Sequence, residues 1–168
     1  MLTRFSPAQG TLQRIAILSL VLMLGIASFA CSGDEKTPEG TIPLKMTTTD
    51  GESRELFVEV AATSQERGVG LSKRTELDSD RGMLFIIPTR GLGFWMKDTL
   101  IPLSVAFIGP CGEIVLIDDM EPQTETLHDT DKPYKYGLEA NKGWFARNGI
   151  TEGAKVEIPA EYRQPECG

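Results

Sequence analysis

The chain is short of the residues from which most catalytic and metal sites are built. It has three cysteines and one histidine in 168 residues, and no Cys-x-x-Cys spacing, so the sequence gives no basis for a dithiol redox centre or a zinc site. His128 stands in an acidic segment without a Gly-x-Ser-x-Gly elbow, which does not suggest a Ser-His-Asp hydrolase. A Walker loop, a dinucleotide-binding glycine pattern, a His-Glu-x-x-His helix and an EF-hand loop are also missing. We therefore expect no metal and no cofactor, although a pair of carboxylates brought together by folding could still catalyse a reaction.

Positive charge is also scarce. The chain has 17 Lys and Arg against 24 Asp and Glu, and its formal net charge is −7. An acidic surface repels nucleic acid and anionic lipid, so we expect neither as a partner. Membrane contact is expected only through the lipid anchor considered next.

The longest apolar run, residues 15–30, follows Arg4 and Arg14 near the N-terminus. It is shorter than the ~20 apolar residues of a membrane-spanning helix and ends in small residues. This pattern is typical of an export signal, which we assign to residues 1–30.

Cys31 follows this signal at once, as in bacterial lipoproteins, although Ser28 stands where such signals usually carry Leu. Residues 31–42 are polar and contain Pro and Gly, as expected of a flexible tether. One interpretation is lipid attachment at Cys31 and a place in the cell envelope. The alternative is cleavage that leaves a soluble periplasmic or secreted protein.

The other two cysteines are Cys111, in a Gly-Pro-Cys-Gly turn, and Cys167, in the tail formed by residues 161–168. In an oxidising compartment these two could form a disulfide. Two free thiols are an equally good interpretation.

Short extended segments dominate residues 43–160, which we expect to form a single domain. Residues 44–48 and 56–60 flank an Asp50-Gly51 turn and predict a hairpin, and the capping-box pattern from Thr63 to Glu66 predicts a short helix from Ser64. Further extended segments are expected over residues 83–87, 94–97, 103–108, 113–117, 134–140 and 155–158, with an aperiodic segment at 118–133 and a second short helix around Trp144 capped by Asn141. The prediction is a mainly β fold: a small closed or partly open β-barrel of about seven short strands with two short helices, or else an open sandwich.

An ordered set of motifs resembles the domain of unknown function 192 family, a group of small bacterial and archaeal proteins. The matching motifs are Glu66-Arg67 with Gly70-Leu71, Gly82 to Phe85, Phe94 to Thr99 with Ile101 to Leu103, Met120 to Pro122, Leu138-Glu139, and Gly143 to Phe145 with Gly149-Ile150. The resemblance implies a compact β-rich barrel and no settled activity, substrate or cofactor. The chain differs from the family in having Asp98 where Asn is usual and Ser104 where Asp is usual. If the family's site relies on a carboxylate at the position of Ser104, this chain has moved the charge to Asp98 or lost the function.

Several polar and aromatic residues of these motifs are candidates for a functional face: Arg67, Trp95, Lys97, Asp98, Glu121, Glu139 and Trp144. Their structural interpretation is that Arg67 pairs with Glu139 and Lys97 with Asp98, while the tryptophans belong to the core. Their functional interpretation is a pocket with an aromatic wall and a few polar groups, suited to a small polar ligand. The methionines at 83, 96 and 120 follow no ligand spacing and are expected to be packing residues.

The leading functional hypothesis is an envelope-tethered, non-enzymatic binding or accessory module for a small ligand or an envelope protein. One alternative is a small hydrolase-like enzyme with Asp98 and Glu139 as acid and base and Lys97 as a stabiliser of negative charge. Another is a purely structural domain of an envelope assembly. These hypotheses differ on whether Lys97, Asp98 and Glu139 meet in one accessible pocket.

Overall fold

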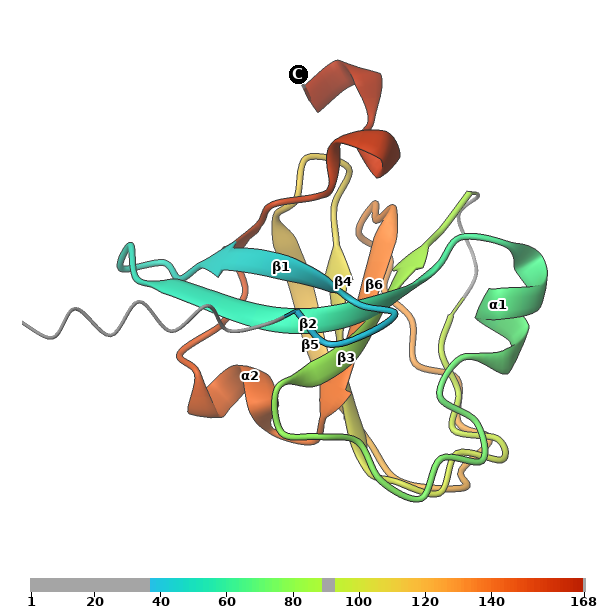
Figure 1. Ribbon diagram of the computed structural model, residues 1–168. Coiled ribbons are helices and arrows are strands. Elements are labelled where there is room, and N and C mark those ends of the chain that lie inside the picture. The colour runs from blue at the N-terminus through green and yellow to red at the C-terminus, as the bar shows by residue number, and fades with distance from the viewer. Residues whose placement is uncertain (1–36, 89–92, 168) are drawn as a thin grey trace, which may run out of the picture. The chain divides into compact units, whose positions relative to one another are not determined.

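A curled β-sheet forms the body of the protein in the computed structural model, which describes residues 37–88 and 93–167 (Figure 1). The predicted signal at residues 1–30, Cys31 and the first part of the tether lie outside these residues. Within the described ranges the strands are β1 Ile42–Thr47, β2 Ser53–Ala61, β3 Arg81–Ile86, β4 Leu103–Ile108, β5 Ile114–Met120, β6 Tyr136–Asn141 and β7 Lys155–Val156. The helical elements are α1 Ser64–Val69, α2 Trp144–Arg147 and two 3₁₀ turns, Ala160–Tyr162 and Pro165–Cys167.

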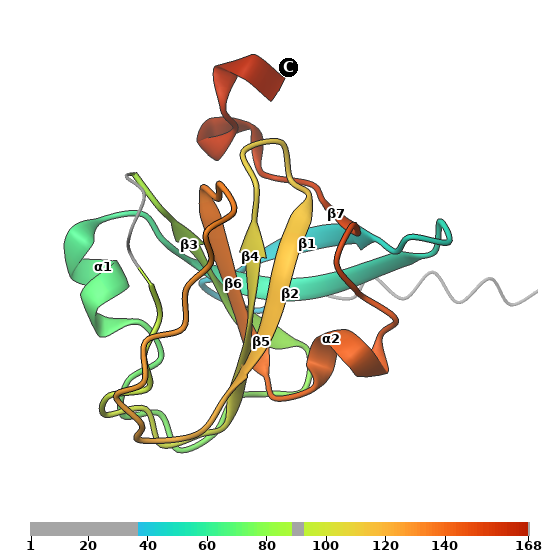
Figure 2. The same cartoon turned by 180° about the vertical axis from the view of Figure 1, so that it is seen from behind.

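The seven described strands follow the order β5-β4-β6-β3-β2-β1-β7 in a single sheet. Neighbours are antiparallel except for β2 and β3, which run parallel and are connected through α1. The sheet curls so far that its two edges touch at one isolated bridge, between Glu113 and Lys155 (Figure 2). This curled half-barrel with two short α-helices confirms the predicted partly open barrel and replaces the alternative of an open sandwich.

The local signals at the start of the domain act as predicted. β1 and β2 form the expected hairpin, and Thr63 caps α1. The Thr63 hydroxyl accepts the Glu66 amide at 3.2 Å, and the Glu66 carboxylate accepts the Thr63 amide at 2.8 Å. The helix ends at Gly70, whose φ of +49° is a conformation that glycine adopts easily.

Residues 94–97 do not form the predicted extended strand. Phe94 makes only an isolated bridge with His128, in which each amide donates to the other's carbonyl at 2.8 and 2.7 Å. A tight turn interrupts the segment directly afterwards, because Thr99 donates its amide to Met96 and Asp98 takes a left-handed φ of 58°.

The predicted cap of the second helix is also wrong. Asn141 ends β6, and its side-chain amide donates to the carbonyls of Leu77 and Asp78 at 3.0 and 2.8 Å. α2 instead begins after Gly143, which has a φ of 73°. The polar side chain of Asn141 is thus used to hold the β2–β3 connection rather than to start a helix.

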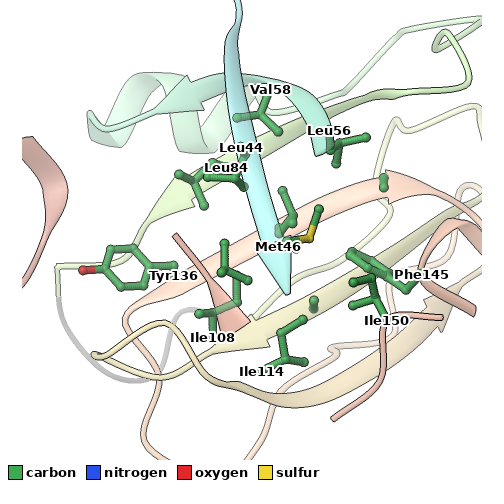
Figure 3. Close-up of a cluster of buried hydrophobic side chains, with 14 of the residues drawn as sticks. Leu44, Met46, Leu56, Val58, Leu84, Ile108, Ile114, Tyr136, Phe145 and Ile150 are labelled. Atoms are coloured by element: carbon green, nitrogen blue, oxygen red, sulfur yellow. The ribbon is translucent and has the colours of Figure 1, made fainter. Parts of the chain in front are cut away.

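Apolar side chains cover both faces of the central strands. The first cluster fills the concave side and includes Leu44, Met46, Leu84 and Tyr136 (Figure 3). The second cluster lies on the other face and includes Phe85, Phe94, Met96, Phe107 and Met120. Because β3, β4 and β6 are buried on both sides, their sequences are almost continuously apolar.

Phe94 is central to the second cluster although it comes from a loop. Its ring makes edge-to-face contacts with Phe85 at 5.2 Å and Phe107 at 5.5 Å between centroids. Gly137 on β6 makes room for it, since a Cβ atom there would lie 2.1 Å from the Phe94 ring. The loop at 93–99 is thereby held against the sheet.

Cys111 and Cys167 form a disulfide with their Cα atoms 5.2 Å apart. It fastens the C-terminal 3₁₀ turns to the β4–β5 turn. Among the described residues, no helix has both the length and the apolar character needed to cross a membrane.

Candidate functional site

A cavity of about 440 Å³ opens beside the second apolar cluster. Its walls come from α1 and the turn after it, from the end of β3 and from the loop at 93–99. Apolar walls are provided by Val69, Leu71, Phe85, Ile87, Phe94 and Trp95. The polar side chains include Arg67, Lys97, Thr99 and Glu139, so a mainly apolar space meets a few polar groups, as in many ligand sites.

Glu139 lines this cavity from β6. Alternation along the strand directs Tyr136, Leu138 and Ala140 into the first cluster, and therefore directs Glu139 to the opposite face. The residue is only 5% exposed. Among the described residues, no side chain or amide donates a hydrogen bond to its carboxyl group, and none forms an ion pair with it. Burial without such a partner raises the pKa of Glu139 to about 8.

Glu139 is the middle member of a row of residues that crosses the sheet. The register places Glu59 beside Met83, Met83 beside Glu139, Glu139 beside Val105, and Val105 beside Asp118. Directly paired residues point to the same face, so three carboxyl groups share this face with apolar residues between them.

The two outer carboxylates of the row have partners of their own. Glu59 accepts two hydrogen bonds from the Arg74 guanidinium at 2.6 and 2.7 Å, and this contact lowers the pKa of Glu59. Asp118 lies 2.6 Å from Nδ1 of His128. The fold thus supplies a partner at both ends of the row and leaves the middle carboxyl facing the cavity.

Two cationic residues also line the cavity, and neither contacts Glu139. Arg67 donates through Nη1 to the carbonyls of Ala62 and Ile86, at 2.5 and 3.1 Å. Lys97 places its Nζ 5.4 Å from the centre of the Trp95 ring and 4.0 Å from the Glu125 carboxylate. Trp95 is itself 53% exposed.

Four of the seven predicted functional residues therefore lie on one cavity: Arg67, Trp95, Lys97 and Glu139. The expected ion pairs of Arg67 with Glu139 and of Lys97 with Asp98 are not formed.

The other three candidates lie elsewhere. Asp98 is exposed in its turn and does not line the cavity. Glu121 forms an ion pair with Lys142. Trp144 is 2% exposed within the first cluster and donates its indole N–H to Asp80 at 3.1 Å, so it has the core role that the sequence offered as its structural interpretation.

Ser104 is fully buried on β4. Its hydroxyl donates to the Asp119 carboxylate on β5 and accepts the Gly143 amide at 2.8 Å. The carboxylate that contacts Ser104 is therefore Asp119, not Asp98. Through its bond to the Gly143 amide, the Ser104 hydroxyl connects the start of α2 to the sheet.

Apart from Arg67, sequence reasoning missed the residues of α1 and its following turn, where Gly68, Val69, Gly70 and Ser72 line the cavity. The capping box located this helix along the chain but could not show which part of the sheet it covers. Thr99 was seen only as a possible hydroxyl partner, yet it is buried and reaches the same cavity.

No group of three or more His, Cys, Asp or Glu residues in the described part of the chain is arranged to hold a metal ion. The three methionines considered above are buried in the second cluster, where they serve as packing residues.

The family model of DUF192, described as an uncharacterized ACR, matches residues 45–158, and the chain belongs to this family. A comparison with curated proteins finds no match.

Two crystal structures are similar to this chain. A proposed transcription regulator from Sinorhizobium meliloti 1021 is 34% identical, with a TM-score of 0.67, over 70% of this chain and 92% of that one. A protein of unknown function from Novosphingobium aromaticivorans DSM 12444 is 38% identical, with a TM-score of 0.66, over 70% of this chain and 85% of that one.

Proposed function

We propose that this protein is a small-molecule-binding domain whose ligand occupies the cavity between α1, β3 and the loop at 93–99. The observation that carries the proposal is Glu139, a largely buried carboxyl group that no described side chain or amide contacts and whose oxygens open onto the cavity. Polar groups in a protein interior are almost always hydrogen-bonded, and the space in front of this carboxyl is the cavity. A bound ligand would supply the missing partner.

The cavity has the size and the lining that this function needs. At about 440 Å³ it falls within the usual range for small-molecule sites. Its aromatic walls belong to the interlocked Phe85 and Phe94 rings, so much of the site exists before a ligand arrives. A preformed site loses less entropy when the ligand binds.

The hydrolase-like alternative has less support, because its carboxylate pair is not assembled. Asp98 does not line the cavity, and Glu139 is the only acid among the described lining residues. Gene regulation, as proposed for the Sinorhizobium protein, would require contact with a polyanion or a regulatory partner. The net charge of −7 opposes direct binding to DNA.

The binding function can be tested with a cavity-filling variant and a matched control. Gly68 lines the cavity, and a Cβ atom at this position would meet open space. Gly68→Trp therefore adds a bulky side chain at the edge of the cavity without a clash at its Cβ atom, whereas Gly68→Ala adds only a methyl group and favours the helix.

The measurement is the melting temperature during a metabolite screen. We expect at least one compound to raise the melting temperature of the wild type and of Gly68→Ala, but not of Gly68→Trp. Equal stabilisation of all three proteins would place binding elsewhere. The absence of any stabilising compound from a broad screen would contradict the proposed function.

We further propose that the domain works at the cell envelope, held there by a lipid on Cys31. The support is sequence-based: the apolar run at 15–30, the cysteine that follows it, and a polar spacer before β1. A single acyl chain gives reversible membrane association, and more than one anchors stably. The cavity would then sample small molecules close to the membrane surface.

A further inference from the structure

We propose that the ligand of this cavity is a small organic anion with an apolar ring, bound through its carboxylate by Arg67 and Lys97 and by a hydrogen bond from Glu139. This inference rests on the proposed binding function and specifies its ligand class. Its basis is the arrangement of three ionisable side chains around an apolar space.

The first step is the charge of the lining. Arg67 and Lys97 are the cations among the described lining residues, and Glu139 is the one acid. The hydrogen bonds of Arg67 go to neutral carbonyls, and within the described part of the chain it forms no ion pair with a carboxylate. Among the described carboxylates, Lys97 pairs with Glu125, at 4.0 Å and largely in solvent, where such a pair contributes little. A chain with a net charge of −7 thus concentrates positive charge at its cavity.

The second step is the protonation state of Glu139. With a pKa of about 8, this carboxyl is mostly neutral at pH 7 and carries an O–H that can donate. A buried acid held neutral in this way can donate a hydrogen bond to an anionic oxygen. A cationic ligand would instead have to ionise Glu139 and also meet Arg67 and Lys97, which repel it.

The third step is the shape of the remaining wall. Leu71, Phe85, Ile87 and Phe94 present apolar carbon to the same space, and the exposed Trp95 extends that surface. A flat hydrocarbon ring would bury its faces against these side chains, while its acidic group faces the cations. A small polar anion such as sulfate or phosphate would leave this wall uncovered.

Three probes of matched shape test the ligand class: 2-naphthoate, 2-naphthamide and 2-naphthylmethylammonium. Each is titrated into the full chain at pH 7, with calorimetry as the readout and Gly68→Trp as the blocked control. We expect 2-naphthoate to bind at least tenfold more tightly than either of the others, and Gly68→Trp to remove that binding. Equal or tighter binding of the amide or the ammonium compound overturns the anion assignment.

These results separate the two proposals. If 2-naphthoate does not bind, the ligand class is wrong. The metabolite screen with the Gly68 variants then decides independently whether the cavity binds small molecules at all.

Two substitutions connect the probes to individual residues. Lys97→Gln, at an exposed position, should weaken the binding of 2-naphthoate severalfold and leave the binding of 2-naphthamide unchanged. An equal loss for both probes would mean that Lys97 acts through packing rather than charge, and would overturn its assigned role.

The pH dependence of binding isolates Glu139. In the wild type, affinity for 2-naphthoate should fall roughly tenfold from pH 7 to pH 9, because the neutral fraction of a group with a pKa of about 8 falls by that factor. The Glu139→Gln variant keeps a neutral hydrogen-bond donor and should bind 2-naphthoate equally well at pH 7 and pH 9. The other charges on this face and lining, namely Arg67, Lys97, Glu59 with Arg74, and Asp118 with His128, are common to both proteins and cancel in the comparison. A fall that persists in Glu139→Gln overturns the role of Glu139.

Discussion

Glu139 is the residue at which stability and the proposed function conflict most clearly. Its strand neighbours are apolar, and its carboxyl lacks the partner that Glu59 and Asp118 have on the same face. Replacement by an uncharged residue of the same shape should therefore relieve a cost. Such costs are commonly accepted at functional sites.

This cost predicts a pH-dependent effect of Glu139→Gln on stability. The pKa of Glu139 is 4.5 in an ordinary setting and about 8 in the folded protein. The folded state therefore retains a proton that the unfolded state releases, so the wild type loses stability as pH rises from about 4.5 to 8. Gln does not titrate.

The difference in melting temperature, variant minus wild type, should thus grow between pH 5 and pH 8.5. At the upper end of this range it should correspond to a difference of about a few kcal/mol in the free energy of unfolding. Thermal unfolding at several pH values measures it, and groups common to both proteins cancel. A difference that is constant over this range would show that Glu139 is not held neutral by burial.

The sequence identified Glu139 as a polar residue in an apolar strand but could not show its environment. That environment depends on how the fold pairs cationic side chains with the carboxylates of this face. Arg74 contacts Glu59 across 15 positions, and His128 contacts Asp118 across 10. Neither pairing has a local pattern, so the unpaired state of Glu139 appears only in three dimensions.

At the scale of elements, α1 depends on its cap more than on its packing. The helix has six residues and none of them is buried, and so short a helix is unstable by itself. The reciprocal hydrogen bonds of Thr63 and Glu66 hold its first turn. Since α1 forms one wall of the cavity, the cap also supports the site.

Thr63→Ala should lower the free energy of unfolding by about 1 kcal/mol, the usual cost of losing such a cap. Thr63→Ser keeps the hydroxyl and should stay close to the wild type. Urea denaturation measures both variants. If Thr63→Ala and Thr63→Ser have the same free energy of unfolding, the cap does not stabilise the helix.

Elements that depend on local signals were predicted well, and those that depend on distant contacts were not. The turn at Asp50-Gly51 and the cap at Thr63 are encoded within a few residues, and both were confirmed. The segment 94–97 has the composition of a strand, yet its place is decided by the Phe94 ring above Gly137 and by the bridge to His128. Asn141 was assigned to the wrong element because its carbonyl partners lie more than 60 positions away.

At the scale of the whole molecule, the proposed anchor predicts where the protein is found. Wild-type protein should sediment with membranes, and Cys31→Ser should remain in the soluble fraction, because the acyl attachment site is lost. A Cys111→Ser, Cys167→Ser double variant is the matched control and should still sediment. Fractionation followed by immunoblotting measures all three. Membrane association of Cys31→Ser would contradict the anchor.

The Cys111–Cys167 disulfide makes part of the domain a covalent ring. The ring encloses β5, the following loop, β6, α2 and β7, whereas β1 to β4 lie outside it. A protease that cuts once between residues 112 and 166 would therefore release no fragment until the disulfide is reduced. Glu139 lies inside the ring, and Arg67, Phe85 and Lys97 lie outside it. In a compartment where proteases act on exposed loops, the two sides of the cavity would stay joined after such a cut.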